Sequence, residues 1–355
     1  MSRFLSARFA DMRPYTPGEQ PQNREYIKLN TNESPFPPAP GVLEAISRAE
    51  TERLNLYSDP DTRAASDAIA SHFGVKRENV LLGNGSDELL SFSFQAFCDR
   101  NTPAVFADIT YGFYEVFARV LCVPVRILPL NEKLQIDPRD YLNAGGTIFI
   151  ANPNAPTGQA LPLRDIKAIL KGNLNHVVIV DEAYVDFGGE SAAELINRYD
   201  NLVVIQTMSK SRNLAGARLG FALANAALIA DLNTMKFSFN PYNVNRLSLL
   251  AAEAAIRDTA YWERCTNEIK RVRGYTVQEL SKRGFTVLPS AANFVFAKAN
   301  RMNGGAYYKA LKEKGVLVRH FEKPRISDYV RISIGTQEQM QALFRATDEI
   351  WEGIL

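Results

Sequence analysis

Cysteine and histidine are scarce in this chain, and their scarcity argues against two kinds of protein. The three cysteines are Cys98, Cys122 and Cys265, and the three histidines are His72, His176 and His320. The cysteines are far apart and form no CxxC pair, so they predict buried free thiols in a reducing compartment, the cytoplasm, and no disulfide scaffold. The histidines lack the spacing of metal ligands, so we expect no metal site.

The chain also lacks an excess of one charge and a long apolar run. Lys and Arg number 41 and Asp and Glu number 39, a formal net charge of +2. No basic stripe with interleaved aromatics is present, so we expect no nucleic-acid partner. The best membrane-span candidate, Leu219–Ala230, is too short and contains Asn225, so we expect no membrane partner. The 46% apolar content over 355 residues is ordinary for a globular protein and allows two domains.

The pattern of elements predicts an arm and two domains. Residues 14 to 40 hold seven prolines, which exclude helix interior, so 1–40 is predicted to be an N-terminal arm. Within 41–245, apolar runs near residues 80, 104, 147, 177, 202 and 221 alternate with helical stretches such as 63–73. This alternation predicts a large α/β domain of three layers, a mainly parallel sheet with helices on both faces.

The remaining residues, 246–355, predict a bridging helix and a small C-terminal α/β domain. The helical run extends from residue 246 to residue 282 and has a break near Asp258. Strands are expected at 286–288, 293–297, 316–319 and 329–334.

A lysine just after a buried strand is the most informative residue. The strand covers Leu202–Ile205, and Lys210 follows it beside Ser209, eight residues before Arg218. Alone, such a lysine caps the strand and points to solvent. Desolvation would instead favour the neutral amine, which can attack a carbonyl and form a Schiff base. Ser209 and Arg218 can together bind a phosphate, since arginine presents a planar fork of donors.

Two further strand ends carry groups of the same kind. The strand near residue 80 leads through Gly85 to Ser86 and Asp87 at a predicted helix start, with Ser86 as the cap. This is either a plain capped helix or an anion site of backbone amides, with about equal weight. The strand 176–180 ends in Asp181, three residues before Tyr184. Asp181 could cap a helix or form an ion pair, but ligands bind at such carboxyl ends in α/β folds.

These motifs, in this order, resemble those of the fold type I pyridoxal-phosphate-dependent aminotransferases over nearly the whole chain. The matching strings are T-x-S-K at 207–210 with an Ala-Gly pair and Arg218 after it, G-x-G-S-D-E at 83–88, and D-E-A-Y at 181–184. The resemblance implies pyridoxal 5'-phosphate as cofactor, with Lys210 as Schiff-base lysine and proton shuttle. It implies that Asp181 keeps the ring nitrogen protonated and that Tyr184 reaches the phenolic oxygen.

The resemblance also assigns the rest of the cofactor site. The phosphate would be bound by Gly85, Ser86, Asp87, Ser209 and Arg218. In the T-Y-G-x-Y string at 110–114, Tyr111 would stack on the ring, with Tyr114 behind it. The family's N-P-N-N-P-T-G string is here N-P-N-A-P-T-G, so Ala155 replaces the usual asparagine. Either Asn154 turns in as its substitute or Tyr184 does more of the work. A trans Ala155–Pro156 bond remains the expectation, although the prolines raise the frequency of cis.

Other motifs of the family point to the partner subunit and the substrate. Asn32, in K-L-N-T-N-E-S-P, would border the active site, and Tyr57 would reach the cofactor phosphate of the other subunit, which implies a homodimer with shared sites. Arg331, in V-R-I-S-I-G-T, matches the carboxylate-binding arginine. Arg319 and Tyr15 match the substrate-phosphate and arm positions of the histidinol-phosphate aminotransferase subfamily. The resemblance therefore implies transamination of histidinol phosphate with 2-oxoglutarate, in histidine biosynthesis.

Three alternatives remain open on the sequence. A threonine-phosphate decarboxylase of the cobalamin pathway and an aromatic amino-acid aminotransferase share these motifs. A binding protein without catalysis could keep the fold, but the intact Lys210 and Asp181 argue against it.

Overall fold

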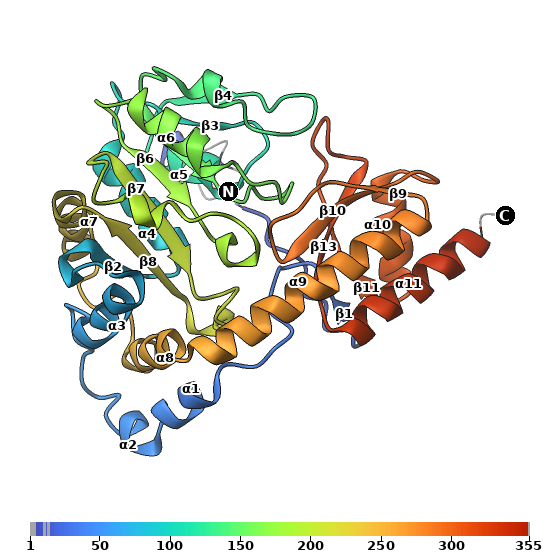
Figure 1. The fold of residues 1–355 in the computed structure, drawn as a ribbon, viewed down its shortest axis with the longest axis horizontal. Helices are drawn as coiled ribbons and strands as arrows, with labels where there is room; N and C mark the ends of the chain where they lie inside the picture. Colours follow the sequence, from blue (N-terminus) through green and yellow to red (C-terminus); the bar gives the residue numbers. More distant parts are fainter. Residues whose placement is uncertain (1–4, 10–11, 13–14, 354–355) are drawn as a thin grey trace.

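The computed structural model describes residues 5–9, 12 and 15–353. Parts of the predicted arm, among them the Arg13-Pro14 pair before Tyr15, and the last two residues lie outside this range. Figure 1 shows the central sheet on one side of the molecule and the smaller sheets on the other, with the long helix α9 running between them.

The central sheet has seven strands in the order β2-β8-β7-β6-β5-β3-β4. Their bounds are β2 Val80–Asn84, β3 Ala104–Ala107, β4 Val125–Leu128, β5 Thr147–Ala151, β6 Val178–Asp181, β7 Leu202–Thr207 and β8 Leu219–Ala224. Only β8 runs antiparallel to its neighbours, so the prediction of a mainly parallel sheet is confirmed. The sequence analysis did not predict β4, an edge strand on which Val125 and Ile127 are exposed.

Helices cover both faces of this sheet, because alternate strand residues point to opposite sides. In β7, Leu202 and Val204 belong to one core cluster, and Val203 and Ile205 to the other. The first cluster includes residues of α1 Pro40–Ala45, α3 Arg63–Phe73, α6 Leu163–Lys171 and α8 Arg246–Arg257. The second includes residues of α4 Ser86–Phe97, α5 Phe113–Val120 and α7 Ala226–Phe239. The fold is therefore the three-layer α/β arrangement that was predicted.

The C-terminal part contains a four-stranded antiparallel sheet, β12-β13-β10-β9. Its strands are β9 Phe285–Val287, β10 Phe294–Ala299, β12 Arg319–His320 and β13 Tyr329–Ser333, packed with α10 Gly304–Glu313 and α11 Gln337–Glu352. The single strand predicted at 316–319 is wrong. Its first half, β11 Val316–Leu317, pairs instead with β1 Ile27–Lys28 of the arm, and only Arg319 continues into the larger sheet, opposite Arg331.

The helical run is interrupted at Asp258, as predicted. Asp258 ends α8, and its side chain accepts a hydrogen bond from Tyr261 N at the start of α9 Thr259–Lys282. Because α8 packs on α1 and α3, large-domain packing continues beyond residue 245. The exact division at 245 and 246 stays a prediction.

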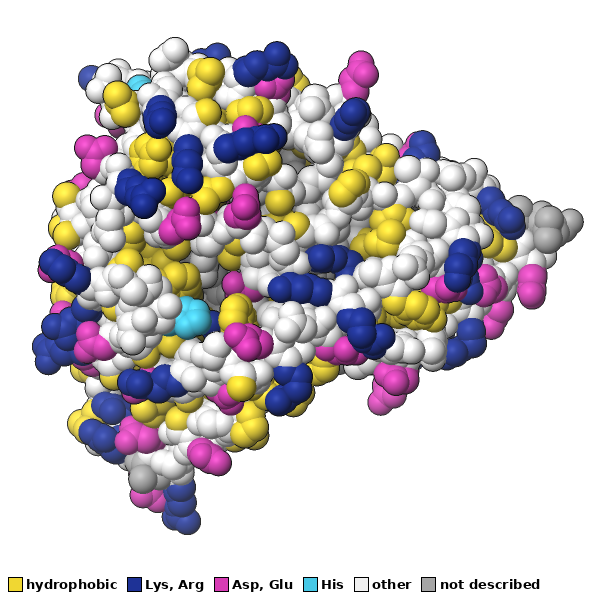
Figure 2. Space-filling view, in the orientation of Figure 1, with side chains coloured by type: hydrophobic (Ala, Val, Ile, Leu, Met, Phe, Trp, Pro, Cys, Tyr) yellow, Lys and Arg dark blue, Asp and Glu magenta, His cyan; other side chains and the backbone are white. Residues whose placement is uncertain are grey.

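The remaining described elements are short. They are α2 Arg48–Thr51 and the 3₁₀ helices Ala7–Phe9, Arg77–Asn79, Pro138–Tyr141, Val185–Phe187, Ala192–Leu195 and Ala215–Ala217. No helix in the described ranges is both long and apolar enough to cross a bilayer. Figure 2 shows basic and acidic side chains interspersed on one face, without a broad area of one sign. Of the three cysteines, Cys265 is buried, Cys98 is half-buried and Cys122 is exposed, which corrects the expectation of three buried thiols.

Candidate active site

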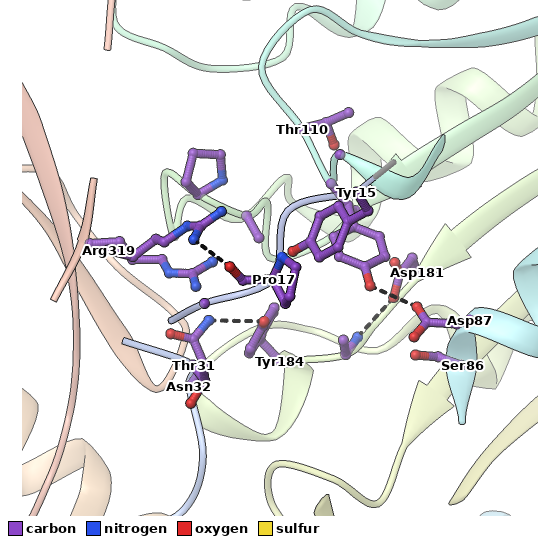
Figure 3. A pocket seen from close by; sticks show the side chains of 18 of the residues that line it. Tyr15, Pro17, Thr31, Asn32, Ser86, Asp87, Thr110, Asp181, Tyr184 and Arg319 are labelled. Atoms are coloured by element: carbon purple, nitrogen blue, oxygen red, sulfur yellow. Dashed lines mark hydrogen bonds between the residues drawn. The ribbon is translucent and has the colours of Figure 1, made fainter. Parts of the chain in front are cut away.

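A cavity of about 490 Å³ opens between the central sheet, the four-stranded C-terminal sheet (called the small sheet below) and the arm. The last residues of three parallel strands, Ala151, Asp181 and Thr207, all line it, at the edge where α/β folds bind ligands. The predicted site residues that line it are Tyr15, Asn32, Ser86, Asp87, Tyr111, Asp181, Tyr184, Ser209, Lys210, Arg218, Arg319 and Arg331. Figure 3 shows many of these side chains converging on one space. Three others, Gly85, Tyr57 and Asn154, are not part of its lining.

Lys210 lies in the loop after β7, and its amine faces the cavity. Its Nζ donates a hydrogen bond to the carbonyl oxygen of Thr31 at 3.1 Å. Burial, assisted by the nearby charge of Arg331, lowers the pKa of Lys210 from 10.5 to about 8. A larger fraction of the amine is therefore neutral near pH 7, the form that attacks a carbonyl.

The turn before α4 and Arg218 lie together and form a candidate anion site. Arg218 Nη1 lies 3.4 Å from Ser209 Oγ, and Nη2 lies 3.6 Å from Asp87 Oδ2. A Cβ on Gly85, whose φ is +80°, would lie 2.7 Å from Arg218 Nη2, so glycine permits this close approach. The cap predicted at Ser86 is wrong, because Gly85 holds the cap position and Ser86 is the first helical residue. Ser86 lines the cavity at the positive end of the helix dipole.

An aromatic wall closes one side of the cavity. Tyr111 OH donates a hydrogen bond to Asp87 Oδ1 at 2.7 Å, which fixes the ring beside the anion site. Burial, with the nearby Asp87 carboxylate, raises the pKa of Tyr111, so the phenol stays protonated. Tyr15 of the arm packs on Phe113 at 4.2 Å between ring centroids and meets Tyr111 edge-on. The arm thus extends the wall that Tyr111 begins.

Asp181 is a buried carboxylate at the end of β6. Its Oδ2 accepts a hydrogen bond from Tyr114 OH at 2.9 Å, and its Oδ1 accepts one from Ala183 N at 3.2 Å. Burial outweighs these bonds and raises the pKa of Asp181 from 3.8 to about 6. Tyr114 lies behind Asp181 and outside the cavity lining, as the sequence suggested.

Removal of the Tyr114 hydroxyl tests this support. We expect Tyr114→Phe to lower the free energy of unfolding by about 1–3 kcal/mol, because a buried carboxylate loses a donor. The same loss should raise the pKa of Asp181 further. Urea unfolding at pH 5 and pH 8 measures the first effect, and carboxyl infrared titration measures the second. A pKa that does not rise would contradict the assigned hydrogen bond.

Asn154 does not turn into the cavity. Its Nδ2 donates to Ile109 O and to Thr157 Oγ1, both at 3.0 Å, and its Oδ1 accepts from Thr110 Oγ1 at 2.9 Å. With both ends of the amide occupied, the geometry favours Tyr184 of the two candidates for the phenolic oxygen. Both Asn152–Pro153 and Ala155–Pro156 are cis, which corrects the expected trans bond at the second position.

Tyr184 is positioned by a motif whose details the sequence did not reveal. Its hydroxyl accepts a hydrogen bond from Asn32 Nδ2 at 3.0 Å. Asn32 has a φ of +54°, and its backbone N–H and carbonyl are bound by Ser333 Oγ and Asn293 Nδ2. Asparagine tolerates this left-handed conformation better than most residues. The asparagine at this position is the only feature of the local sequence that could have indicated it. Burial raises the pKa of Tyr184, so its hydroxyl stays protonated.

Two arginines of the small sheet face the cavity in different ways. Arg331 lies over the Phe294 ring at 5.3 Å, and its Nη2 donates to Asn30 O at 3.2 Å. The Nε of Arg331 is buried without a partner in the described residues, a donor that suits an anionic ligand. Arg319, which Figure 3 shows beside Pro17 of the arm, instead donates to the carbonyls of Pro17 and Thr16, at 2.9 and 2.7 Å.

Tyr57 lies outside this cavity. It is 78% exposed and stacks on Tyr242 at 4.4 Å between ring centroids. A single chain does not bring it to its own site, and its predicted contact with a second subunit stays a prediction.

The chain resembles one family over almost its whole length. The model of the aminotransferase class I and II family matches residues 24–346. A histidinol-phosphate aminotransferase of Marinomonas sp. (strain MWYL1) is 49% identical over 98% of this chain and 99% of that protein. One from Clostridium botulinum (strain Kyoto / Type A2) is also 49% identical, over 96% of each. The solved histidinol-phosphate aminotransferase from Sinorhizobium meliloti in complex with pyridoxal-5'-phosphate has a TM-score of 0.84 and 25% identity, covering 94% of this chain and 93% of that one.

The groups in the cavity fit the cofactor of this family. The amine of Lys210, the anion site around Arg218, the carboxylate of Asp181 and the ring of Tyr111 all border one space. These are an amine for an aldehyde, donors for a phosphate, and a carboxylate and an aromatic face for a pyridine ring. The chain belongs to the aminotransferase class I and II family and is a pyridoxal-phosphate-dependent aminotransferase.

Proposed function

We propose that this aminotransferase transfers the amino group of histidinol phosphate to 2-oxoglutarate, a reaction of histidine biosynthesis. The observation that carries the proposal is the pairing of Arg319 with Arg331 on neighbouring strands, on the cavity wall contributed by the small sheet. A substrate with an amine and a distal phosphate could place the first near Lys210 and the second near these cations. The names of the relatives at 49% identity support the same substrate.

Lys210 would act twice. When bound, pyridoxal phosphate supplies an aldehyde that condenses with amines and a ring that withdraws electrons from the attached carbon. Lys210 would carry the cofactor through its Nζ and give way to the substrate amine. The freed Nζ, with its lowered pKa of about 8, would take the proton from the carbon that bears the amino group and later return one.

Asp181 and Tyr184 would hold the ring in its reactive form. The Asp181 carboxylate would keep the ring nitrogen protonated, since a negative charge in a buried place favours a nearby positive one. Tyr184 OH, already oriented by Asn32, would donate to the phenolic oxygen. Ser86, Ser209 and Arg218 would bind the phosphate, and Tyr111 would stack on the ring.

We also propose a homodimer with shared sites. Exposed apolar side chains on α1, the segment after α2, and the end of α7 include Leu43, Leu54, Leu56, Tyr57 and Phe239. Exposed apolar groups of this size suggest a covered surface, and Tyr57 would then reach the partner's cofactor phosphate. A cytoplasmic location stays a prediction from the sequence.

A substrate comparison tests the proposal. The cofactor-loaded protein receives 2-oxoglutarate with histidinol phosphate, phenylalanine or phosphothreonine, and glutamate and carbon dioxide are measured. We expect kcat/KM for histidinol phosphate to exceed that for phenylalanine by at least about 100-fold, because phenylalanine has no distal phosphate to interact with the cations of the cavity wall that the four-stranded sheet contributes. Equal use of phenylalanine would indicate an aromatic aminotransferase, and carbon dioxide from phosphothreonine would indicate a decarboxylase; either result overturns the proposal.

A further inference from the structure

The charges that line the cavity are divided between its two walls. The carboxylates in the lining, Asp87, Glu115 and Asp181, all come from the side of the central sheet. The lining residues from β12, β13 and the segment between them are Arg319, Phe321, Lys323, Ile326 and Arg331. This wall therefore contributes three cations and no carboxylate. Lys323 has no role in any motif considered above.

The three cations differ in how far other groups occupy them. Both terminal nitrogens of Arg319 donate to carbonyls of the arm. Arg331 donates once, to Asn30 O, and keeps a buried Nε without a partner. Within the described residues, the amine of Lys323 forms no hydrogen bond or ion pair, although five other lysines form ion pairs within 3 Å. Lys323 therefore has donor capacity to offer a ligand at the cavity rim.

The backbone that carries Lys323 is held at a fixed place. Two residues later, Arg325 reaches the large domain and donates to Asp108 Oδ2 at 3.1 Å and to the carbonyls of Leu130 and Asn131 at 2.9 and 2.6 Å. Ile326 is 1% exposed, and its N–H donates to the carbonyl of Lys323 at 3.2 Å. Only the Lys323 side chain must be ordered when a ligand binds, which limits the entropic loss.

The charge of a substrate's distal group determines how strongly it would interact with the Lys323 amine. A phosphate monoester carries about −1.5 to −2 charges at pH 7 and three acceptor oxygens, whereas a carboxylate carries one charge and two oxygens. Arg331 offers free donors enough for a carboxylate, while Arg319 is largely occupied by the arm. We propose that Lys323 is a specificity-determining residue that binds the distal phosphate of the amino donor and contributes little to carboxylate substrates. This inference rests on the proposed function.

Three variants test the role of Lys323. Lys323→Met removes the charge and keeps the apolar stem, Lys323→Arg keeps the charge, and Lys309→Met is the matched control. Lys309 is an exposed lysine of α10 that does not line the cavity. For each protein, kcat/KM is measured for histidinol phosphate and for glutamate as amino donor, at two salt concentrations.

We expect Lys323→Met to lower kcat/KM for histidinol phosphate by about five- to tenfold, mainly through KM, with glutamate changed less than twofold. Lys323→Arg should restore most of the loss, and Lys309→Met should match wild type. The loss should shrink at high salt, because the rim charge is screened. The inference about Lys323 would be overturned if Lys323→Met lowered kcat/KM equally for both amino donors, or if it caused no loss in an enzyme that uses histidinol phosphate. Either result would leave the proposed function standing. A wild-type enzyme that ignores histidinol phosphate would instead overturn the proposed function.

Discussion

Replacement of Lys210 by alanine should lower transamination at least about 10⁴-fold while the chain still folds. The variant loses the amine that joins the cofactor and the group that moves the proton, and proton transfer alone is worth about 10²–10⁴-fold. The Lys210 amine makes one hydrogen bond, to Thr31 O. Its loss therefore removes little support from the fold. Activity is measured as glutamate formed, and folding by circular dichroism and thermal unfolding.

The pH dependence of stability gives a second check on this variant. The pKa of Lys210 falls from 10.5 to about 8 on folding. Below pH 8 the buried amine is therefore charged, and this lowers the free energy of unfolding. This disadvantage disappears as the pH rises from 8 to 10.5. The alanine variant should thus gain stability relative to cofactor-free wild type at pH 7 and lose that gain at pH 10.5. If Lys210→Ala unfolded at pH 7, the expected gain in stability would be contradicted. If it kept full turnover, the catalytic role of Lys210 would be refuted.

A matched lysine control is available in the same chain. Lys236 is buried at 1% exposure, but its amine bonds to the Pro60 carbonyl, outside the cavity. Lys236→Met should leave kcat per folded molecule near that of wild type, whatever its effect on the free energy of unfolding. A primary amine such as methylamine should partly restore proton transfer in Lys210→Ala and not in other variants. If Lys236→Met also lost activity and methylamine did not rescue Lys210→Ala, the lost activity of Lys210→Ala would reflect a general disturbance of the fold.

Replacement of Asp181 by asparagine should lower kcat by about 10²–10³-fold. Asparagine has nearly the same shape, and its oxygen can still accept the bond from Tyr114 OH, which wild type has at 2.9 Å. It carries no negative charge, however, so it cannot keep a ring nitrogen protonated, and lost preorganised electrostatics are commonly of this size. Steady-state kinetics with the cofactor-loaded variant measures the effect.

The same substitution should stabilise the cofactor-free chain above pH 6. The pKa of Asp181 rises from 3.8 to about 6 on folding, so the folded state binds the proton more tightly. Wild-type stability therefore falls as the pH rises from 3.8 to 6 and stays reduced above 6. At 1.36 kcal/mol per pKa unit the reduction is about 3 kcal/mol. Urea unfolding of both proteins should show equal stability near pH 4 and a more stable asparagine variant at pH 8. The reverse order at pH 8 would contradict the assigned burial.

Local sequence patterns predicted the fold and many of the residues that line the cavity. Lys210 and Asp181 follow continuous apolar strands, and the carboxyl ends of parallel strands meet at one edge, so their convergence followed from the strand order. β4 was missed because Val125 and Ile127 are exposed at the sheet edge and make only a weak apolar run after Pro124.

Contacts between distant segments were beyond local pattern. The orientation of Asn154 depends on Thr110 and Ile109, more than 40 residues away in the chain. The split of the strand at 316–319 depends on the arm, because β1 pairs with Val316 and Leu317 only after the chain has folded back. The same is true of Arg319, whose hydrogen bonds reach across about 300 residues to Pro17 and Thr16.

Reductive trapping would test the cofactor attachment most directly. The protein is loaded with pyridoxal 5'-phosphate, reduced with borohydride, digested, and its peptides are analysed by mass spectrometry. The structure predicts one pyridoxyl phosphate group per chain, on Lys210, with Lys236 and Lys323 unmodified and with no label on that peptide in Lys210→Ala. A label that is found mainly on another lysine, or that persists at the same level in Lys210→Ala, would contradict the assignment of Lys210 as the residue that holds the cofactor.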